Sequence, residues 1–275
     1  MKVEDLKEVP DAGLFGLQEM YDLQKELIKP FQGIEGLPDY PLDVDTKENQ
    51  ALLKDFIARI VEELGEAFQE FEILYGLVNE KDKDVDKMLV HLSKLNEEVS
   101  DAMHFFLELL IYINIGDSSV WAYTEKIMSQ LNLNLEADAL ENILKVALHH
   151  NQLNGRVHWN AQSAYHIGTL YSLSGEGVDE FLRGGRKIGP EQLINQKILL
   201  WEITYQLQLV GNQLKNKPWT QTGKPTNVDM LQEAAVQAFL HFFCWLSYMG
   251  HTPKSVYTVY WKKNQVNQQR IKDKR

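Results

Sequence analysis

Apolar residues recur every three or four positions along most of the chain, and the strict alternation that indicates half-buried strands is nearly absent. This spacing is typical of amphipathic helices, which bury one face and leave the other in solvent. We therefore predict an all-α protein built as a helical bundle. The expected helices lie near residues 13–29, 47–78, 84–115, 118–131, 136–153, 190–216, 227–250 and 253–271.

Residues that break or cap helices stand between these segments. Lys29-Pro30 and the stretch 33–41 are expected to end the first helix, because proline disfavours a helical conformation in the residue before it. Asp45-Thr46 is suited to cap the second helix, since both side chains can accept a hydrogen bond from a free backbone N–H.

The 275 residues are read as a single domain, and a hydrophobic content of 44% is enough for a sizeable core. Residues 1–116 carry the first helices, residues 117–226 form an insert of unassigned role, and residues 227–275 form a C-terminal helix pair. Within the insert, residues 154–189 mix glycine, serine and aromatics without a clear period. That region is expected to hold short helices and long loops.

Two short acidic pairs stand in the same register on two of the expected helices. Glu63 and Glu66 are three residues apart, and Glu98 and Asp101 have the same spacing. Each pair therefore lies on one helix face. Apolar residues fall at equal offsets from the first acid in both helices, which predicts packing through these stripes with the acids along the seam. The stripes are Ile60, Leu64, Ala67 and Phe71, and Leu95, Val99, Ala102 and Phe106.

Four carboxylates along one seam would repel one another strongly unless divalent cations neutralised them. Hard carboxylate oxygens suit Mg²⁺, for which Mn²⁺ can substitute. The pattern predicts a magnesium site formed by Glu63, Glu66, Glu98 and Asp101. The alternative is a solvated charged face, because Glu-x-x-Glu is common on helices. Against it, an aspartate that precedes a long apolar run needs a partner.

The C-terminal segment VYWKKNQVNQQR offers cationic and amide donors on one side of a helix. Lys263, Asn267 and Arg270 share a face and Asn264 borders it. Such donors can hold phosphate oxygens. Basic residues also favour a helix C-terminus through its dipole. That explanation does not cover two asparagines, which are poor helix formers.

Three blocks of the chain resemble motifs of the dimeric, all-α dUTPases, a family that includes the phage dCTPase-dUTPase enzymes and belongs with the MazG-like nucleotide pyrophosphatases. Their order along the chain is also that of the family, and residues 23–27 (LQKEL) resemble its first, base-contacting motif. The blocks are Glu63-x-x-Glu66, Glu98-x-x-Asp101-x-x-His104-Phe105 and Tyr260-x-x-Lys263-Asn264-x-x-Asn267-x-x-Arg270.

The resemblance implies hydrolysis of a deoxynucleoside triphosphate, dUTP above all, to the monophosphate and pyrophosphate by a metal-activated water. It implies two or three Mg²⁺ ions, a homodimer, and Glu63 as one candidate for the acid that orients the water. Gln24 becomes a candidate contact to the nucleobase. The family's metal ligands fall on Glu63, Glu66, Glu98 and Asp101, and its phosphate, sugar or base contacts fall on Lys263, Asn264, Asn267 and Arg270.

Departures from the family pattern concern the base more than the metal. Ile28 stands where the uracil-specific members usually have asparagine, and Ile271 stands where they have glutamine. The Trp- and Lys-rich stretch often found after the first acidic pair is missing. Two alternatives therefore stay open: a MazG-like enzyme that acts on dCTP, dTTP or a purine nucleotide, and a noncatalytic helical interaction module.

Charge and composition narrow the partners. A net charge of −11 disfavours nonspecific binding to nucleic acid, although metal ions would let an acidic chain bind a phosphorylated substrate. The longest apolar run, residues 105–113, is interrupted by Glu108 and is too short to span a bilayer. The single cysteine excludes an intramolecular disulfide. We expect a cytoplasmic protein that binds neither membrane nor nucleic acid.

The chain also contains a weak internal repeat. The segment DAMHFFLELLIYINIGDSSVWAY is similar to QAFLHFFCWLSYMGHTPKSVYTV: each has His-Phe-Phe in an apolar helix, then a turn, then Ser-Val and an aromatic residue. The second copy has Ala235 and Ala238 where the first has Glu98 and Asp101. A duplicated helical hairpin would explain this, and chance similarity between amphipathic helices is the alternative.

Overall fold

The computed structural model describes residues 16–82, 84–131, 140, 142–147, 189–216 and 223–273, and every regular element within them is an α-helix. The prediction of an all-α protein is thereby confirmed. Residues 142–147 are also helical, while most of the predicted helix 136–153 and nearly all of 154–189 lie outside the described residues. The labelled helices are α1 (Leu17–Glu35), α2 (Lys47–Asn79), α3 (Val85–Tyr112), α4 (Asp117–Leu131), α8 (Pro190–Gln213), α9 (Val228–Tyr248) and α10 (Pro253–Lys272).

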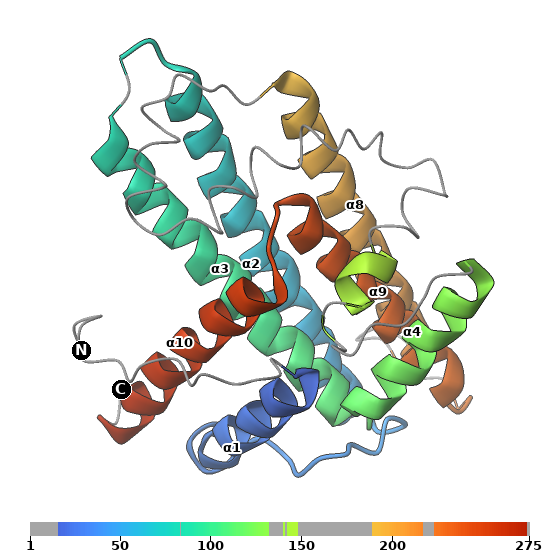
Figure 1. Ribbon diagram of the computed structural model, residues 1–275. Coiled ribbons are helices and arrows are strands. Elements are labelled where there is room, and N and C mark those ends of the chain that lie inside the picture. The colour runs from blue at the N-terminus through green and yellow to red at the C-terminus, as the bar shows by residue number, and fades with distance from the viewer. Residues whose placement is uncertain are drawn as a thin grey trace.

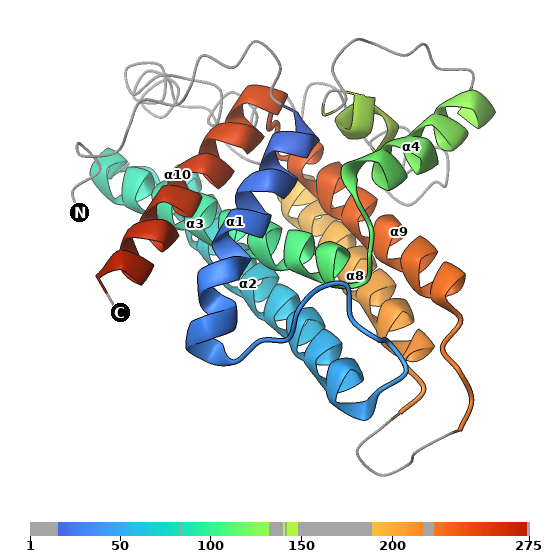
Figure 2. The same cartoon turned by 90° about the horizontal axis from the view of Figure 1, so that it is seen from below.

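Two helix pairs, α2 with α3 and α8 with α9, form the centre of the molecule (Figure 1). The pairs lie against each other through α2 and α8, and α3 also contacts α9. On the side away from α8, α1 and α10 pack together and both cross α3 (Figure 2). Segments from the two ends of the described chain thus meet over the middle of α3.

Side-chain caps determine where the two central helices begin. The Thr46 hydroxyl accepts a hydrogen bond from the N–H of Asn49 at 3.2 Å, as predicted for the start of α2. Asp84 caps α3 by accepting from the N–H of Lys87 at 3.0 Å. Each cap satisfies one of the backbone donors that a helix leaves free at its first turn.

The prediction that Lys29-Pro30 ends the first helix is wrong. Pro30 lies inside α1, which runs on to Glu35 and stops where Gly36 adopts a left-handed φ of 68°. Proline removes one backbone donor and crowds the preceding turn. The packing of α1 against the core, where Ile28 is fully buried, outweighs that cost.

The α2 and α3 helices pack through the predicted apolar stripes. All eight stripe side chains are at most 2% exposed, namely Ile60, Leu64, Ala67, Phe71, Leu95, Val99, Ala102 and Phe106. Each large apolar side chain buried in this way contributes roughly 1.5–3 kcal/mol. The seam between the helices is therefore fixed, and so is the register of the acids along it.

The α3 and α9 helices end in the same arrangement. After α3, Asn114 adopts a left-handed φ of 63°, and the N–H of Ile115 donates to the carbonyl of Leu110 at 2.8 Å. After α9, Gly250 has a φ of 85°, and the N–H of His251 makes the equivalent bond at 2.9 Å to the carbonyl five residues back. Both are Schellman-type endings, and each leads directly into the next helix.

Taken singly, none of the helices in the described ranges has the length and apolar character needed to cross a membrane. The α3 and α4 helices reach that length and apolarity only when counted together across a bend of 98°.

Candidate metal centre and adjoining cavity

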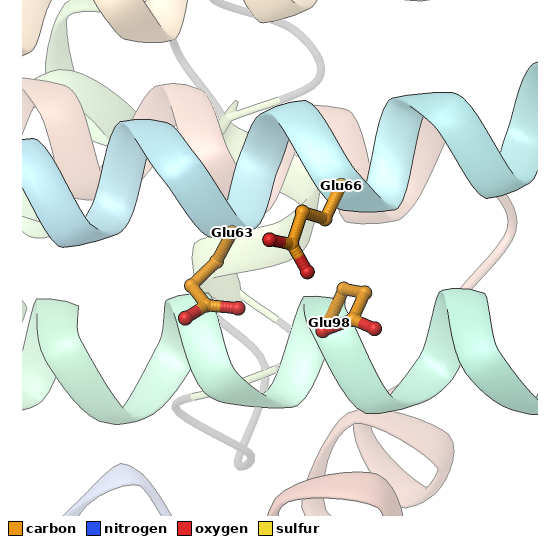
Figure 3. A group of neighbouring side chains, drawn as sticks. All are labelled: Glu63, Glu66 and Glu98. Carbon is orange, nitrogen blue, oxygen red and sulfur yellow. The ribbon is translucent and has the colours of Figure 1, made fainter.

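Three of the four predicted metal ligands come together between α2 and α3. Glu63 and Glu66 lie on one face of α2, and Glu98 faces them from α3 (Figure 3). One carboxylate oxygen from each residue lies within 4.8 Å of one from each of the other two. We call these residues the carboxylate triad.

Repulsion between the negative charges of the triad contributes to raised pKa values for two of its members, Glu63 and Glu98. Burial, together with the negative charges of Asp101, Glu98 and Glu66, raises the pKa of Glu63 to about 7. Burial and the charges of Asp101 and Glu66 likewise raise the pKa of Glu98 above its usual range. A cation would relieve the repulsion between these close carboxylates, and hard oxygen donors at this spacing fit Mg²⁺ or Mn²⁺.

Asp101, the fourth predicted ligand, has a different partner. Its carboxylate lies 2.6 Å from the Lys263 ammonium, which also donates to Glu97 at 2.7 Å. Burial alone would lower the pKa of Lys263, but its attraction to Asp101 and Glu97 outweighs burial and raises it. Lys263 therefore stays charged, and it links α10 to the acidic face of α3.

A cavity of about 300 Å³ begins at the acids and continues away from them between α1, α2 and α3. Glu63 and Asp101 line it, and on α2 the lining extends through Phe56 to Leu52. At 1.5 Å per residue, the eleven positions from Glu63 to Leu52 span about 16 Å. The cavity is thus elongated, with carboxylates towards one end and mainly apolar side chains towards the other.

The predicted C-terminal contacts separate into two groups. Asn267 and Arg270 line the cavity, and the side-chain oxygen of Asn267 accepts a hydrogen bond from the Arg270 guanidinium at 3.5 Å. Asn264 is fully buried, where it donates to the Leu23 carbonyl at 3.4 Å and accepts from Gln268 at 2.9 Å. Asn264 fastens α10 to α1 and does not line the cavity, so its role as a substrate contact stays a prediction.

Gln24 is buried at the cavity wall in a chain of hydrogen bonds. Its side-chain carbonyl accepts from the Tyr260 hydroxyl at 3.0 Å, and its amide nitrogen donates to Glu108 at 3.3 Å. These bonds join α10, α1 and α3. The amide position predicted to contact a nucleobase is therefore rigidly placed.

His104 contributes a neutral imidazole to the same wall. Its Nδ1 donates to the Ser100 carbonyl at 2.7 Å, and its ring stacks on Tyr260 with centroids 4.4 Å apart. Burial lowers the pKa of His104 to about 4, so its Nε2 carries a lone pair at neutral pH. Within the described residues this Nε2 has no hydrogen-bond partner.

Sequence reasoning missed two acids and one cation of the site. Glu97 holds Lys263, Glu108 lines the cavity beside Gln24, and Arg59 lines it one turn from Glu63. Glu108 had a visible signal, because it interrupts an otherwise apolar run on α3. Glu97 and Arg59 had none, since both lie among the many charged residues of their helices.

Comparisons with known proteins do not identify a family for this chain: no family model matches it, and neither a curated protein nor a solved structure does. The resemblance to the dimeric all-α dUTPases therefore rests on the motif residues. Because one fold serves many functions, the activity has to be argued from the site.

Proposed function

We propose that the protein is a Mg²⁺-dependent pyrophosphohydrolase that converts a pyrimidine deoxynucleoside triphosphate, dUTP first among them, to the monophosphate and pyrophosphate. The observation that carries this proposal is the carboxylate triad, one member of which, Glu63, also lines an elongated cavity. Gln24, Asn267 and Arg270, three of the five substrate contacts expected from the motifs, line that same cavity.

The donor set of the triad fits a centre of two or three divalent ions, with Mn²⁺ as a substitute for Mg²⁺. Three carboxylates within 4.8 Å offer six oxygens, and Asp101 adds two more once Lys263 moves to another anion. When bound, Mg²⁺ would neutralise the charge of the triphosphate and acidify a water molecule for attack on phosphorus.

The proton of the attacking water is assigned to Glu63. This side chain lines the cavity, so its carboxylate can accept a hydrogen bond from a water molecule held there. The reaction requires no covalent intermediate.

Cationic side chains hold the phosphate groups in this proposal. The Arg270 guanidinium lines the cavity and presents several donors in one plane, which suits phosphate oxygens. Lys263, one turn before Asn267, is held by Asp101 and Glu97 in this structure. A triphosphate would compete with these carboxylates for the ammonium.

Two alternatives to this function can be separated from it by experiment. A different base preference, for dCTP, dTTP or a purine nucleotide, would leave the metal chemistry unchanged. A noncatalytic interaction module would make the acids surface charge, but the partly buried position of Asp101 and the raised pKa of Glu63 oppose that. The homodimer remains part of the proposal on the strength of the motif resemblance.

The decisive experiment is a panel of deoxynucleoside triphosphates incubated with Mg²⁺ and scored for monophosphate and pyrophosphate. We expect one pyrimidine nucleotide to be preferred. Asp101→Asn should lower its turnover by orders of magnitude without loss of helicity. Asp86→Asn, an exposed acid at the start of the same helix, is the matched control and should have no effect. Absence of pyrophosphate with every nucleotide would refute the proposal.

A further inference from the structure

The cavity extends well past the acids, and one buried carboxyl group lies there without a role in the metal centre. Glu108 is 9% exposed and lines the cavity together with Gln24 and Arg59. It stands seven residues beyond Asp101 on α3, about 10 Å along the helix axis. That separation leaves room for a sugar between a phosphate held near the acids and a base held near Glu108.

Glu108 is held in a fixed orientation by neighbouring helices. The Tyr260 hydroxyl donates to Gln24, and the Gln24 amide nitrogen donates to Oε1 of Glu108 at 3.3 Å. In the described part of the chain, no protein group is hydrogen-bonded to the other carboxyl oxygen, Oε2. Since Oε1 accepts from Gln24, a proton on the carboxyl group resides on Oε2. Glu108 then offers an O–H donor beside a carbonyl acceptor.

The protonation state of Glu108 follows from burial and from the charges around it. Burial raises its pKa to about 8; on its own Arg59 from α2 would lower this pKa, and Glu35 from α1 raises it. The Arg59 Nε donates to Asp55 at 2.8 Å, and among the described residues no ion pair joins Arg59 to Glu108. The Tyr112 and Tyr260 hydroxyls and the His104 ring are neutral at pH 7, and Glu63, Asp101 and Arg270 are the further titratable groups that line the same cavity.

We propose that Glu108, ordered by Gln24 and Tyr260, is a specificity-determining residue that binds the edge of a pyrimidine base through adjacent O–H and C=O groups. Positions 3 and 4 of cytosine or uracil present a neighbouring donor and acceptor that pair with these two groups. This inference rests on the proposed nucleotide substrate and defines which part of it the inner cavity recognises. The motif resemblance implied Gln24 alone as the nucleobase contact; here Glu108 contacts the base and Gln24 orients Glu108.

Because Glu108 would bind the base through its O–H group, its ionisation should make the binding affinity depend on pH. Below pH 8 the carboxyl group keeps its O–H donor, and above pH 8 it becomes a carboxylate that can only accept. At pH 9 roughly one molecule in eleven retains the proton, so affinity for a base that needs a donor should fall about tenfold between pH 7 and pH 9. A glutamine at this position has a donor and an acceptor at every pH.

The test measures binding of deoxycytidine by calorimetry in EDTA, because this nucleoside has no phosphate for the metal-free acids to repel and its base does not titrate between pH 7 and pH 9. We expect Glu108→Leu to weaken binding at least tenfold at pH 7. We expect Glu108→Gln to bind within threefold of the wild type at pH 7 and to remove the loss at pH 9. Glu62→Gln, an exposed acid on α2, is the matched control and should behave as the wild type does.

Two results would overturn the inference: wild-type affinity in Glu108→Leu, or an unchanged alkaline loss of affinity in Glu108→Gln. The second remains informative even if Glu108→Leu fails to fold. Hydrolysis of nucleotides by a Glu108→Leu protein with unchanged KM would also overturn it while leaving the proposed activity intact. Conversely, Glu108-dependent binding of deoxycytidine by a protein that hydrolyses no triphosphate would support the base site and refute only the proposed activity.

Discussion

The α2–α3 and α8–α9 pairs have similar architecture but differ in what lies along their seams. His104 on α3 and His241 on α9 each donate from Nδ1 to the carbonyl four residues back, at 2.7 and 2.8 Å. The two helices also end in the same Schellman-type arrangement. Counting from these histidines, Ala238 occupies the place of Asp101. These shared features are what a duplicated hairpin would leave.

Neutral groups close the α8–α9 seam. The Asn195 side chain donates to the Tyr248 hydroxyl at 2.7 Å, and the Trp245 indole donates to the side-chain oxygen of Gln196. Ala235 is fully buried where α3 has Glu98. The comparison teaches that this architecture does not need carboxylates between its helices. The acids of the α2–α3 seam, with their raised pKa values, are better explained by chemistry than by folding.

The largest expected effect comes from removing an acid of the triad. Glu98→Ala makes α3 resemble α9 at this position, and we expect it to abolish tight Mn²⁺ binding and to lower turnover on the order of 10³-fold. The folded state should not be destabilised, because one of three repelling charges disappears. Calorimetric titration with Mn²⁺ measures the binding. Glu62→Ala is the control on α2, and unchanged metal affinity in Glu98→Ala would contradict the assignment.

The reverse change places an acid in the neutral seam. Ala238 is fully buried, so Ala238→Asp puts a carboxyl group among apolar side chains without a cation to pair with. We expect a loss of roughly 4 kcal/mol in the free energy of unfolding, measured by urea denaturation at pH 7. Met230→Asp, at an exposed position on the same helix, should cost far less. A stable Ala238→Asp protein would show that either seam tolerates acids.

The two helix pairs also differ at Glu108 on α3, because the corresponding residue on α9 is Trp245. Burial raises the pKa of Glu108 from 4.5 to about 8. The native state therefore keeps a proton that the unfolded chain releases at lower pH, and stability falls as pH rises between these values. Glu108→Gln removes this loss and should stabilise the protein by roughly 3 kcal/mol at pH 7 and by little at pH 4. Urea denaturation across this pH range measures it, and a gain that is equal at both pH values would contradict the buried-acid explanation.

The smallest expected effect concerns Lys263, the cation that joins α10 to the acidic seam. Lys263→Ala should raise KM about tenfold through loss of a phosphate contact. It also leaves Asp101 and Glu97 unpaired, so a moderate loss of stability should accompany it. Lys262→Ala, at the exposed neighbouring position, is the control. Unchanged steady-state kinetics in Lys263→Ala would remove Lys263 from the proposed phosphate site.

The helices and the acidic pairs were predictable because the information is local. A period of three to four residues determines which side chains share a face, so the stripes around Leu64 and Val99 were sufficient to predict the α2–α3 seam. The position of Glu66 three residues after Glu63 likewise fixed their common direction. Of the two breaks predicted for α1, the stretch 33–41 contains the observed end at Gly36, whereas Lys29-Pro30 does not stop the helix, since tertiary packing carries it past Pro30.

Tertiary structure decided which of these local groups meet. Asp101 was expected to join three other acids, but α10 brings Lys263 against it from 162 positions further along the chain. Asn264, predicted as a substrate contact, fastens α10 to α1, which its position in the sequence did not indicate. Gln24 and Glu108 are 84 residues apart, and their hydrogen bond exists only because α1 crosses α3. Helical periodicity sets the direction of a side chain on its own helix, whereas its partner, its burial and its pKa depend on helices that the local sequence does not specify.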